Sequence, residues 1–250
     1  MEAPQGGKKT TVITFNITQW RAWAPGLSAP ADWHAWASGN SLSGADACAP
    51  DVAFLPAMQR RRLSHMARMA FAVAWPLAEG QPPLPLVFVS RHGETPRTFS
   101  ILGELAAGQP LSPTQFSLSV HNAVIGLWSI LRGSTCEMTA LAAAGDGFEQ
   151  GVVEAAALMA DGAPAVLLIV TEEQPPPAYG PWIDDVPFAY ALGLLLTPGR
   201  QWQLAPGEVA ASPAVPALPH GLAWLKAMLN GRTDFTHTGK RRTWNWHRQP

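Results

Sequence analysis

Two stretches of the sequence carry residues that could do chemistry. Ser90-Arg91-His92-Gly93-Glu94 directly follows a short apolar segment. A neutral imidazole can attack phosphorus while a guanidinium group neutralises the phosphate oxygens, so this pairing could serve phosphoryl transfer. The second stretch, 116–173, alternates helical and extended patterns about a glycine turn. A strand, a tight turn and a helix in succession form the arrangement on which many α/β enzymes mount a nucleophile.

The elements predicted around these stretches indicate a layered α/β domain. β-Branched and apolar segments predict strands at 11–18, 84–90, 138–144 and 165–171, and a hairpin of 189–197 with 200–204 about Pro198-Gly199. Apolar residues at spacings of three and four predict helices at 58–75 (ended by Pro76), 99–107, 113–130, 146–161 and 220–230. This order predicts helices packed against a mostly parallel sheet.

The helix predicted at 146–161 opens with a capping signal. Asp146 and Glu149 form a D-x-x-E variant of the capping box, in which both side chains bond backbone amides at the start of the helix. A charged group at a helix N-terminus could also be catalytic, but an N-cap explains Asp146 without further assumptions.

Composition limits the classes of function. Apolar residues make up 47% and charged residues 14%, below the roughly 25% usual for soluble domains. The low charge content predicts an extended apolar contact with a partner protein, although an Ala- and Pro-rich bias explains it equally well. A net charge of -1 gives no reason to expect binding to nucleic acid or to an anionic membrane.

The sequence lacks signals for export, membrane insertion and metal binding. The first residues contain no apolar segment typical of a signal peptide, and no apolar run reaches the roughly 18 residues of a membrane span. We therefore expect a cytoplasmic protein in which Cys48 and Cys136 form no disulfide. Neither CxxC nor HExxH occurs, so we expect no metal site and no cofactor.

Four arginines lie on the helix predicted at 58–75, and three of them are consecutive. They are Arg60, Arg61, Arg62 and Arg68. Cations near a helix N-terminus oppose the helix dipole, which makes the cluster locally unfavourable. The cluster is either a solvated face or a docking patch for an acidic partner.

The stretch 90–94 resembles the RHGE signature of histidine phosphatases and phosphoglycerate mutases. The resemblance implies that His92 accepts a phosphoryl group and that Arg91 clamps it. That family also needs a second arginine and a late histidine at the end of another strand. The late pair His220-Gly221 follows Pro219 and a Pro/Ala-rich segment rather than a strand. The alternative is that Arg91 and Glu94 pair within a turn.

The stretch 116–173 resembles a motif region of β-ketoacyl synthases. In those enzymes an Asn-bearing helix leads through a Leu-Arg-Gly-Pro turn to the strand before the catalytic cysteine, and a helix, a glycine turn and a strand ending near Glu follow. The resemblance spans roughly residues 10–200. The matching residues are Ser112-Pro113-x-x-Phe116, 120–126, 129–133, Asp161-Gly162 and Glu172.

The cysteine of that family is missing here. Counting forward from Arg132-Gly133 places its position near Ala142, and counting back from Asp161-Gly162 places it near Gly145. Residues 142–145 contain no thiol, hydroxyl or carboxylate. Cys136 comes several residues too early, so we interpret it as a small buried apolar residue; acyl transfer through it is the alternative. Without a thiolate at the turn, no acyl-enzyme forms there.

The second half of a full synthase supplies two histidines for malonyl decarboxylation and condensation. This sequence shows no counterpart of that half, and its late histidines occur in no pattern that resembles those sites. They are His220, His237 and His247. The chain is therefore not expected to condense acyl groups by itself.

These features together resemble the chain-length-factor proteins of type II polyketide-like systems, especially the short ones of aryl polyene clusters. The resemblance rests on 20–26, 55–62, 87–94 and the Trp/Arg-rich tail. It implies half of a thiolase-like α/β/α fold with a mostly parallel five-stranded sheet. A synthase-like domain at 11–204 would lie between a flexible segment at 1–10 and a Pro/Ala linker, helix and basic aromatic tail at 205–250.

The resemblance also implies partners and a role. A non-catalytic subunit of this kind forms a heterodimer with a full-length β-ketoacyl synthase, completes the dimer and bounds the acyl tunnel in polyene or polyketide biosynthesis. A large apolar interface fits the low charge content. An acyl carrier protein would be the acidic partner of the four arginines. The interface and tunnel candidates are Phe116, His121, Asn122, Leu127 and Trp128, although His121 can equally be a satisfied interface histidine.

Overall fold

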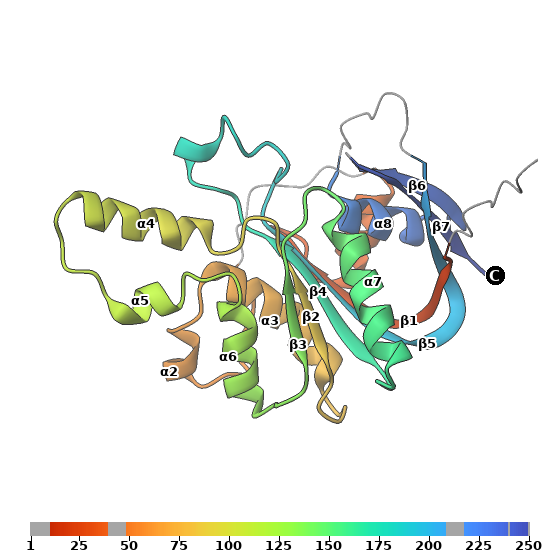
Figure 1. The fold of residues 1–250 in the computed structure, drawn as a ribbon, viewed down its shortest axis with the longest axis horizontal. Coiled ribbons are helices and arrows are strands. Elements are labelled where there is room, and N and C mark those ends of the chain that lie inside the picture. Colours follow the sequence, from red (N-terminus) through yellow and green to blue (C-terminus); the bar gives the residue numbers. More distant parts are fainter. Residues whose placement is uncertain (1–10, 40–48, 209–217, 240, 250) are drawn as a thin grey trace, which may run out of the picture.

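The computed structural model describes residues 11–39, 49–208, 218–239 and 241–249. They form a seven-stranded sheet with helices on both faces (Figure 1). The predictions of a flexible segment at 1–10, of an unpaired Cys48, and of a linker through 209–217 concern residues outside this described part.

The sheet is mixed. Its strands are β1 (Ile13–Trp23), β2 (Leu86–Val89), β3 (Met138–Leu141), β4 (Val166–Glu172), β5 (Tyr190–Gly207), β6 (Asp234–Thr238) and β7 (Thr243–Arg248). Their order is β3-β2-β4-β5-β7-β6, and β1 pairs with β5 outside this path. Among the described strands, β2 pairs in parallel with β3 and β4, and the other pairs are antiparallel. The α/β class is confirmed, but the prediction of a mostly parallel five-stranded sheet is wrong.

The long strand β5 explains much of this difference. It continues through Pro198-Gly199, where the sequence predicted a hairpin. The Asn16 side chain on β1 holds the irregular part of β5 from the side: its Nδ2 donates to the Pro198 carbonyl at 3.3 Å, and its Oδ1 accepts from the Gln201 amide at 3.1 Å. A Cβ on Gly199 would lie 2.1 Å from Asn16 Oδ1, so this close approach requires glycine. A long-range contact therefore overrides the local turn signal.

The C-terminal residues add two more strands. Strands β6 and β7 form a hairpin, and β7 pairs with the second half of β5. Alternate residues of this hairpin point inward and are buried, among them Phe235, His237, Trp244 and Trp246. The basic aromatic tail of the sequence is thus an amphipathic hairpin that buries its rings beside helix α8 (His220–Leu229).

Helices cover both faces of the sheet in three layers. α3 (His65–Ala78) and α6 (Ala123–Arg132) pack on one face, and α1 (Pro30–Ala37), α7 (Gly147–Ala160) and α8 pack on the other (Figure 1). In β4 the side chains of Leu168 and Val170 point to the α7 side, while Leu167 and Ile169 point to the α3 side. All seven residues of β4 are buried, as its unbroken apolar sequence predicts.

Two of the predicted helices are interrupted. The helix predicted at 58–75 is α2 (Ala57–Arg60) followed by α3, whose start is capped by Ser64 Oγ accepting from the Ala67 amide at 3.0 Å. α3 then continues past Pro76 to Ala78, because a proline in the last turn removes only one helical hydrogen bond. The helix predicted at 113–130 is α5 (Pro113–Ser117) and α6, separated by a turn at 118–122.

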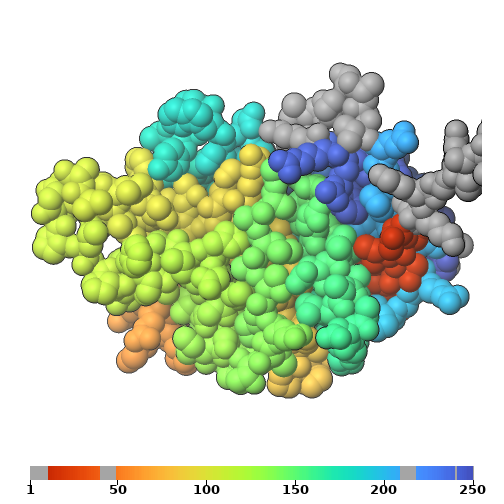
Figure 2. Space-filling view, in the orientation of Figure 1, coloured from red at the N-terminus to blue at the C-terminus, as the bar shows by residue number. Residues whose placement is uncertain are grey.

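Helix α4 (Thr95–Ala106) and α5 form an arm that extends away from the sheet (Figures 1 and 2). Neither helix contains a buried residue. We refer to residues 95–117 as the α4–α5 arm. In the described part of the chain, no helix has the length and apolar character needed to cross a membrane.

The close contact of α7 with the sheet gives a test of the fold. A Cβ on Gly151 would lie 2.7 Å from Val89 Cγ2 and 2.8 Å from Leu168 Cδ1. We expect Gly151→Ala to lower the free energy of unfolding by about 1–3 kcal/mol, because overpacking forces neighbouring side chains from their rotamers. Urea denaturation measures this change.

Gly126→Ala on α6 is the matched control. Nothing lies within 4 Å of its added Cβ, so it should raise stability by up to about 1 kcal/mol through helix propensity. Equal stability of the two variants would contradict the packing of α7 described here.

Candidate functional site

The strand, turn and helix predicted to mount a nucleophile are present. Strand β3 leads through a turn at 142–145 into α7, and Gly145 adopts a left-handed conformation with φ of 87°. Ala142, Ala144 and Gly145 are exposed. Cys136 lies before β3 and is half-buried, with its backbone amide near Ser134 Oγ at 3.4 Å. The turn therefore exposes methyl groups and backbone where a nucleophile would sit.

The start of α7 is held by tertiary contacts instead of the predicted capping box. Asp146 occupies the N-cap position, but its side chain makes no capping hydrogen bond. Its Oδ2 accepts from Trp244 Nε1 and from Gln150 Nε2, each at 3.1 Å, and lies 3.8 Å from Arg242 Nε. Glu149 points into the interior and does not cap the helix. The capping-box prediction is wrong because both carboxylates have stronger partners on the C-terminal hairpin.

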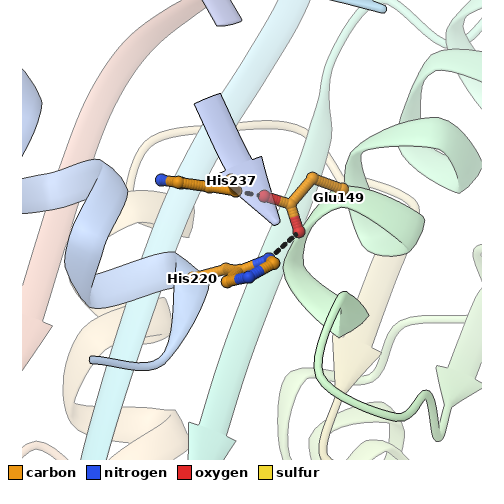
Figure 3. Close-up of side chains that lie close together, drawn as sticks. All are labelled: Glu149, His220 and His237. Atoms are coloured by element: carbon orange, nitrogen blue, oxygen red, sulfur yellow. Dashed lines mark hydrogen bonds and ion pairs between the residues drawn. The ribbon is translucent and has the colours of Figure 1, made fainter. Parts of the chain in front are cut away.

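Glu149 is the centre of a buried polar cluster (Figure 3). Its Oε2 lies 2.8 Å from His220 Nδ1, its Oε1 lies 2.6 Å from His237 Nδ1, and Trp246 Nε1 donates to Oε1 at 3.3 Å. The carboxylate is fully buried. Burial alone would raise its pKa, but the hydrogen bonds and charges of the two histidines lower the pKa of Glu149 to about 2.

His220 and His237 come from α8 and β6, so the cluster joins three separate elements. Burial favours neutral His220, but the hydrogen bond and the charge of Glu149 prevail and raise the pKa of His220. The Nε2 atom of His220 is buried and has no hydrogen-bond partner among the described residues. A cleft of about 420 Å³ is lined by both imidazoles together with Lys226, Asn230 and Arg232.

The RHGE stretch forms a second polar cluster at the end of β2. Ser90 Oγ donates to Glu172 Oε2 at 3.1 Å, and the amides of Arg91 and His92 also donate to this carboxylate. Burial raises the pKa of Glu172, and these hydrogen bonds offset the increase only in part. Gly93 turns the chain with φ of 55° beside His121. The stretch is thus a corner tied to the end of β4.

Asp185 binds Arg91 and His92, the two side chains that phosphoryl transfer would need. Its Oδ2 lies 2.6 Å from Arg91 Nη1, and its Oδ1 lies 2.9 Å from His92 Nε2. Glu94 is bound by Ser64 Oγ and lies 3.3 Å from Arg97 Nε. Arg91 and Glu94 therefore have other partners, and both Arg91 and His92 are already bound to a carboxylate. The geometry does not favour the histidine phosphatase alternative.

The predicted interface and tunnel residues occupy different environments. Phe116 on α5 is 62% exposed, and Asn122 is exposed at the start of α6. His121 is half-buried, and its Nε2 lies 2.7 Å from the Ser90 carbonyl oxygen. Leu127 is half-buried, whereas Trp128 is buried against α3. Of these five residues, Phe116 and Asn122 are exposed, His121 and Leu127 are partly accessible, and Trp128 is not accessible.

The four predicted docking arginines also differ. Arg61 and Arg62 are exposed, whereas Arg60 and Arg68 are half-buried. The Arg68 guanidinium donates to the backbone carbonyls of Arg60, at 2.6 Å, and of Leu63, at 3.4 Å. Arg68 therefore stabilises the end of α2.

Two clusters were missed by the sequence analysis: Glu149 with His220 and His237, and Asp185 with Arg91 and His92. The sequence held partial signals: His237 alternates with Phe235 in an extended segment, and Glu149 lies between Phe148 and Val152 on an apolar helix. A polar residue at such a position needs a partner. The identity of that partner depends on contacts across 71 and 88 residues, which no local pattern encodes.

Comparisons with known proteins show which proteins the chain resembles. Residues 33–247 match the family model described as the N-terminal domain of β-ketoacyl synthases. The solved structure of the ketosynthase ApeO in complex with its chain length factor ApeC, from Xenorhabdus doucetiae, contains a chain that is 33% identical with a TM-score of 0.84. The match covers 94% of this chain and 100% of that chain.

More distant structures share the fold. The ishigamide ketosynthase/chain length factor is 14% identical with a TM-score of 0.59, covering 88% of this chain and 82% of its own. A β-ketoacyl synthase from Burkholderia phymatum is 13% identical with a TM-score of 0.59, covering 90% and 71%. These likenesses confirm the predicted thiolase-like fold. No curated protein sequence matches the chain.

The Asp185 cluster predicts a dependence of stability on pH. Burial raises the pKa of Asp185, but His92 and Arg91 outweigh this effect and lower it to about 2. A carboxyl with a lowered folded-state pKa stabilises the fold above its unfolded pKa of about 3.9, and this contribution is lost as the pH falls towards 2. We expect Asp185→Asn to cost up to about 1 kcal/mol at pH 6, because solvent screens the pair.

Urea denaturation at several pH values measures this difference, which should shrink as the pH falls from 4 to about 2. Asp184→Asn is the control, because Asp184 is exposed and adjacent, and it should change stability by less than about 0.5 kcal/mol. A difference for Asp185→Asn that stays constant down to pH 2 would refute the assignment.

Proposed function

Because the chain belongs to the β-ketoacyl synthase family, we propose that it is a chain length factor: a non-catalytic subunit that pairs with a full-length β-ketoacyl synthase. The similarity to a chain of the ApeO–ApeC complex supports pairing with a synthase. The observation that carries the proposal is the turn at 142–145. It has the strand–turn–helix geometry that positions a nucleophile, but its residues include no nucleophilic side chain. An acyl-enzyme needs a thiolate or an equivalent group at that turn.

The α4–α5 arm supports the presence of a partner. Helix α4 has twelve residues and none is buried, which is unusual for a helix with apolar side chains. Six large apolar residues on the arm and the turn after it are 40–62% exposed: Phe99, Leu102, Leu105, Leu111, Phe116 and Val120. Exposed apolar residues concentrated on one arm are typical of a protein interface. We assign it to the synthase partner.

The free edge of the sheet offers a second contact. Strand β3 is an edge strand, paired only with β2. The carbonyls of Glu137 and Leu141 accept from β2, so the backbone groups of Met138 and Ala140 face away from it. An edge with free amides and carbonyls can pair with a strand of another chain. The arm and this edge together would form the heterodimer interface.

The role in chain length follows from this interface. Phe116 is on the exposed surface of the arm, and Leu127 and Trp128 follow it on α6. A subunit that presents apolar side chains at the interface would bound the acyl tunnel of the synthase, whose product would be a polyene or polyketide. Arg61 and Arg62 are the exposed cations of the predicted docking patch, and we propose that they attract the acidic acyl carrier protein.

Co-expression with a full-length β-ketoacyl synthase encoded near this chain tests the pairing. We expect a stable 1:1 complex by size-exclusion chromatography with light scattering. Leu105→Glu on the arm should weaken the complex about 10- to 100-fold, because burying a leucine contributes roughly 1.5–3 kcal/mol. Leu105 is 58% exposed, so the isolated variant should fold as the wild type does.

Val12→Glu is the control, because Val12 is 51% exposed and lies next to β1, away from the arm. Its complex should match that of the wild type. A monodisperse chain that ignores the synthase, or equal weakening by both variants, would refute the arm as the interface.

The absence of catalysis predicts the distribution of acyl groups. When the complex is incubated with an acyl-loaded carrier protein, intact mass spectrometry should show an acyl adduct on the synthase and none on this chain. A Cys136→Ser variant should leave the product profile unchanged, because Cys136 is not at the turn. An acyl adduct on Cys136 that turns over with substrate would contradict the proposal.

A further inference from the structure

A metal site would go beyond the proposed subunit role, and the geometry points to one. We propose that Glu149, His220 and His237 bind a divalent transition-metal ion of the zinc type. No spacing motif in the sequence predicts this site, because its three ligands come from separate elements, α7, α8 and β6. Two imidazoles and one carboxylate are a common donor set for zinc and its neighbours in the first transition row.

The three side chains lie together, and each imidazole is turned toward a different oxygen of the Glu149 carboxylate (Figure 3). One ligand atom from each residue lies within 4.8 Å of the other two. The three residues are 0%, 3% and 7% exposed, for Glu149, His220 and His237 respectively. Such a group sits in a rigid, largely dry environment in which a bound cation would neutralise the buried carboxylate.

The present distances are those of hydrogen bonds, and metal binding would lengthen them. Bonds of about 2.0–2.1 Å to a tetrahedral ion place neighbouring ligand atoms about 3.3 Å apart. The two Nδ1–carboxylate contacts are 2.8 Å to Oε2 and 2.6 Å to Oε1, so an ion held by both imidazoles and one of these oxygens requires the other imidazole to turn toward that oxygen. The ion would replace the protons that bridge these contacts, and the protons would leave to solvent or move to Nε2.

Two further observations favour a ligand here over a closed hydrogen-bonded cluster. The ring of His220 interacts with the backbone of Thr238, but its buried Nε2 has no partner in full hydrogen-bond geometry among the described residues. Trp246 Nε1 contacts Glu149 Oε1 at 3.3 Å, and outer hydrogen bonds of this type orient metal-ligating carboxylates.

The cleft beside the cluster provides access and a fourth ligand position. Its volume is about 420 Å³, and both imidazoles line it while Glu149 does not. Three protein ligands with a fourth position open to a cleft are typical of zinc sites that bind water or another small ligand. Lys226 and Arg232 also line the cleft, so the fourth ligand would be water or an anion. Calcium and magnesium are excluded, because they prefer all-oxygen ligand sets.

The test uses the full chain, first dialysed against a chelator and then loaded with Zn²⁺ or Co²⁺. We expect about one ion per chain by elemental analysis, and visible d–d bands of a protein-bound ion with Co²⁺. Zn²⁺ at about a hundred times its Kd should raise the Tm by about 5 °C or more relative to the chelator-treated chain.

Variants locate the ion. His220→Gln and His237→Gln keep an amide that can donate to Glu149, so they preserve the hydrogen bonds better than alanine would. Both should lose at least tenfold in metal affinity. His247→Gln is the matched control, because His247 forms an exposed pair with Asp234 at 2.7 Å on the same hairpin. It should bind the ion as the wild type does.

Three results would overturn the proposal. The first is a wild-type Tm that is the same with metal and with chelator. The second is a Co²⁺ spectrum that matches the free ion. The third is equal metal binding by wild type and His237→Gln. If both glutamine variants fail to fold, the wild-type Tm and Co²⁺ spectrum still decide the question. The outcome is independent of synthase binding, so failure here leaves the proposed function untouched.

Discussion

The rest of the structure depends on one buried charge, the carboxylate of Glu149. An ionised carboxylate without partners is very unfavourable in the interior of a protein. Three donors from His220, His237 and Trp246 solve this problem, and they come from α8, β6 and β7. Helix α7 thereby fixes the position of every element after residue 218 that the structure describes. Removing any one donor would leave the others around an unsatisfied charge, so the C-terminal elements and α7 hold one another in place.

A second buried carboxylate, that of Glu172 at the end of β4, also joins separate segments of the chain. Glu172 ends β4 and holds the corner at 90–94, while Asp185 fixes the loop between β4 and β5 through Arg91 and His92. In the sequence these charged groups resemble a catalytic motif, but in the structure they form hydrogen bonds with one another. The polar residues therefore build a scaffold around the turn at 142–145, and the turn itself carries no reactive group. The strand, turn and helix are present, but the turn has no reactive side chain.

The predictions from sequence succeeded where a signal was local and failed where a distant residue decided the outcome. The buried strand β4 and the turn before α7 follow from unbroken apolar residues and from glycine. The hairpin predicted at Pro198-Gly199 was wrong because Asn16 holds β5 together from about 180 residues away. The capping box failed because Glu149 has better partners in the interior than the helix amides. Local propensity is a weak prior when a tertiary contact of greater energy competes with it.

The buried carboxylates of Glu149 and Glu172 are bound by donors from other parts of the chain, whereas the α4–α5 arm contains no buried residue. Short helices gain most of their stability from packing an apolar face, and within the chain this arm packs only in part, through contacts between α4 and α5 and of Phe99 with Tyr179. In the described part of the chain, the outer edge of β3 is also unpaired. Two independent features, one apolar and one polar, are thus without a partner within the described chain. A partner that covers the arm and pairs with β3 would stabilise both at once, and the conformation of the arm would then depend on the concentration of that partner.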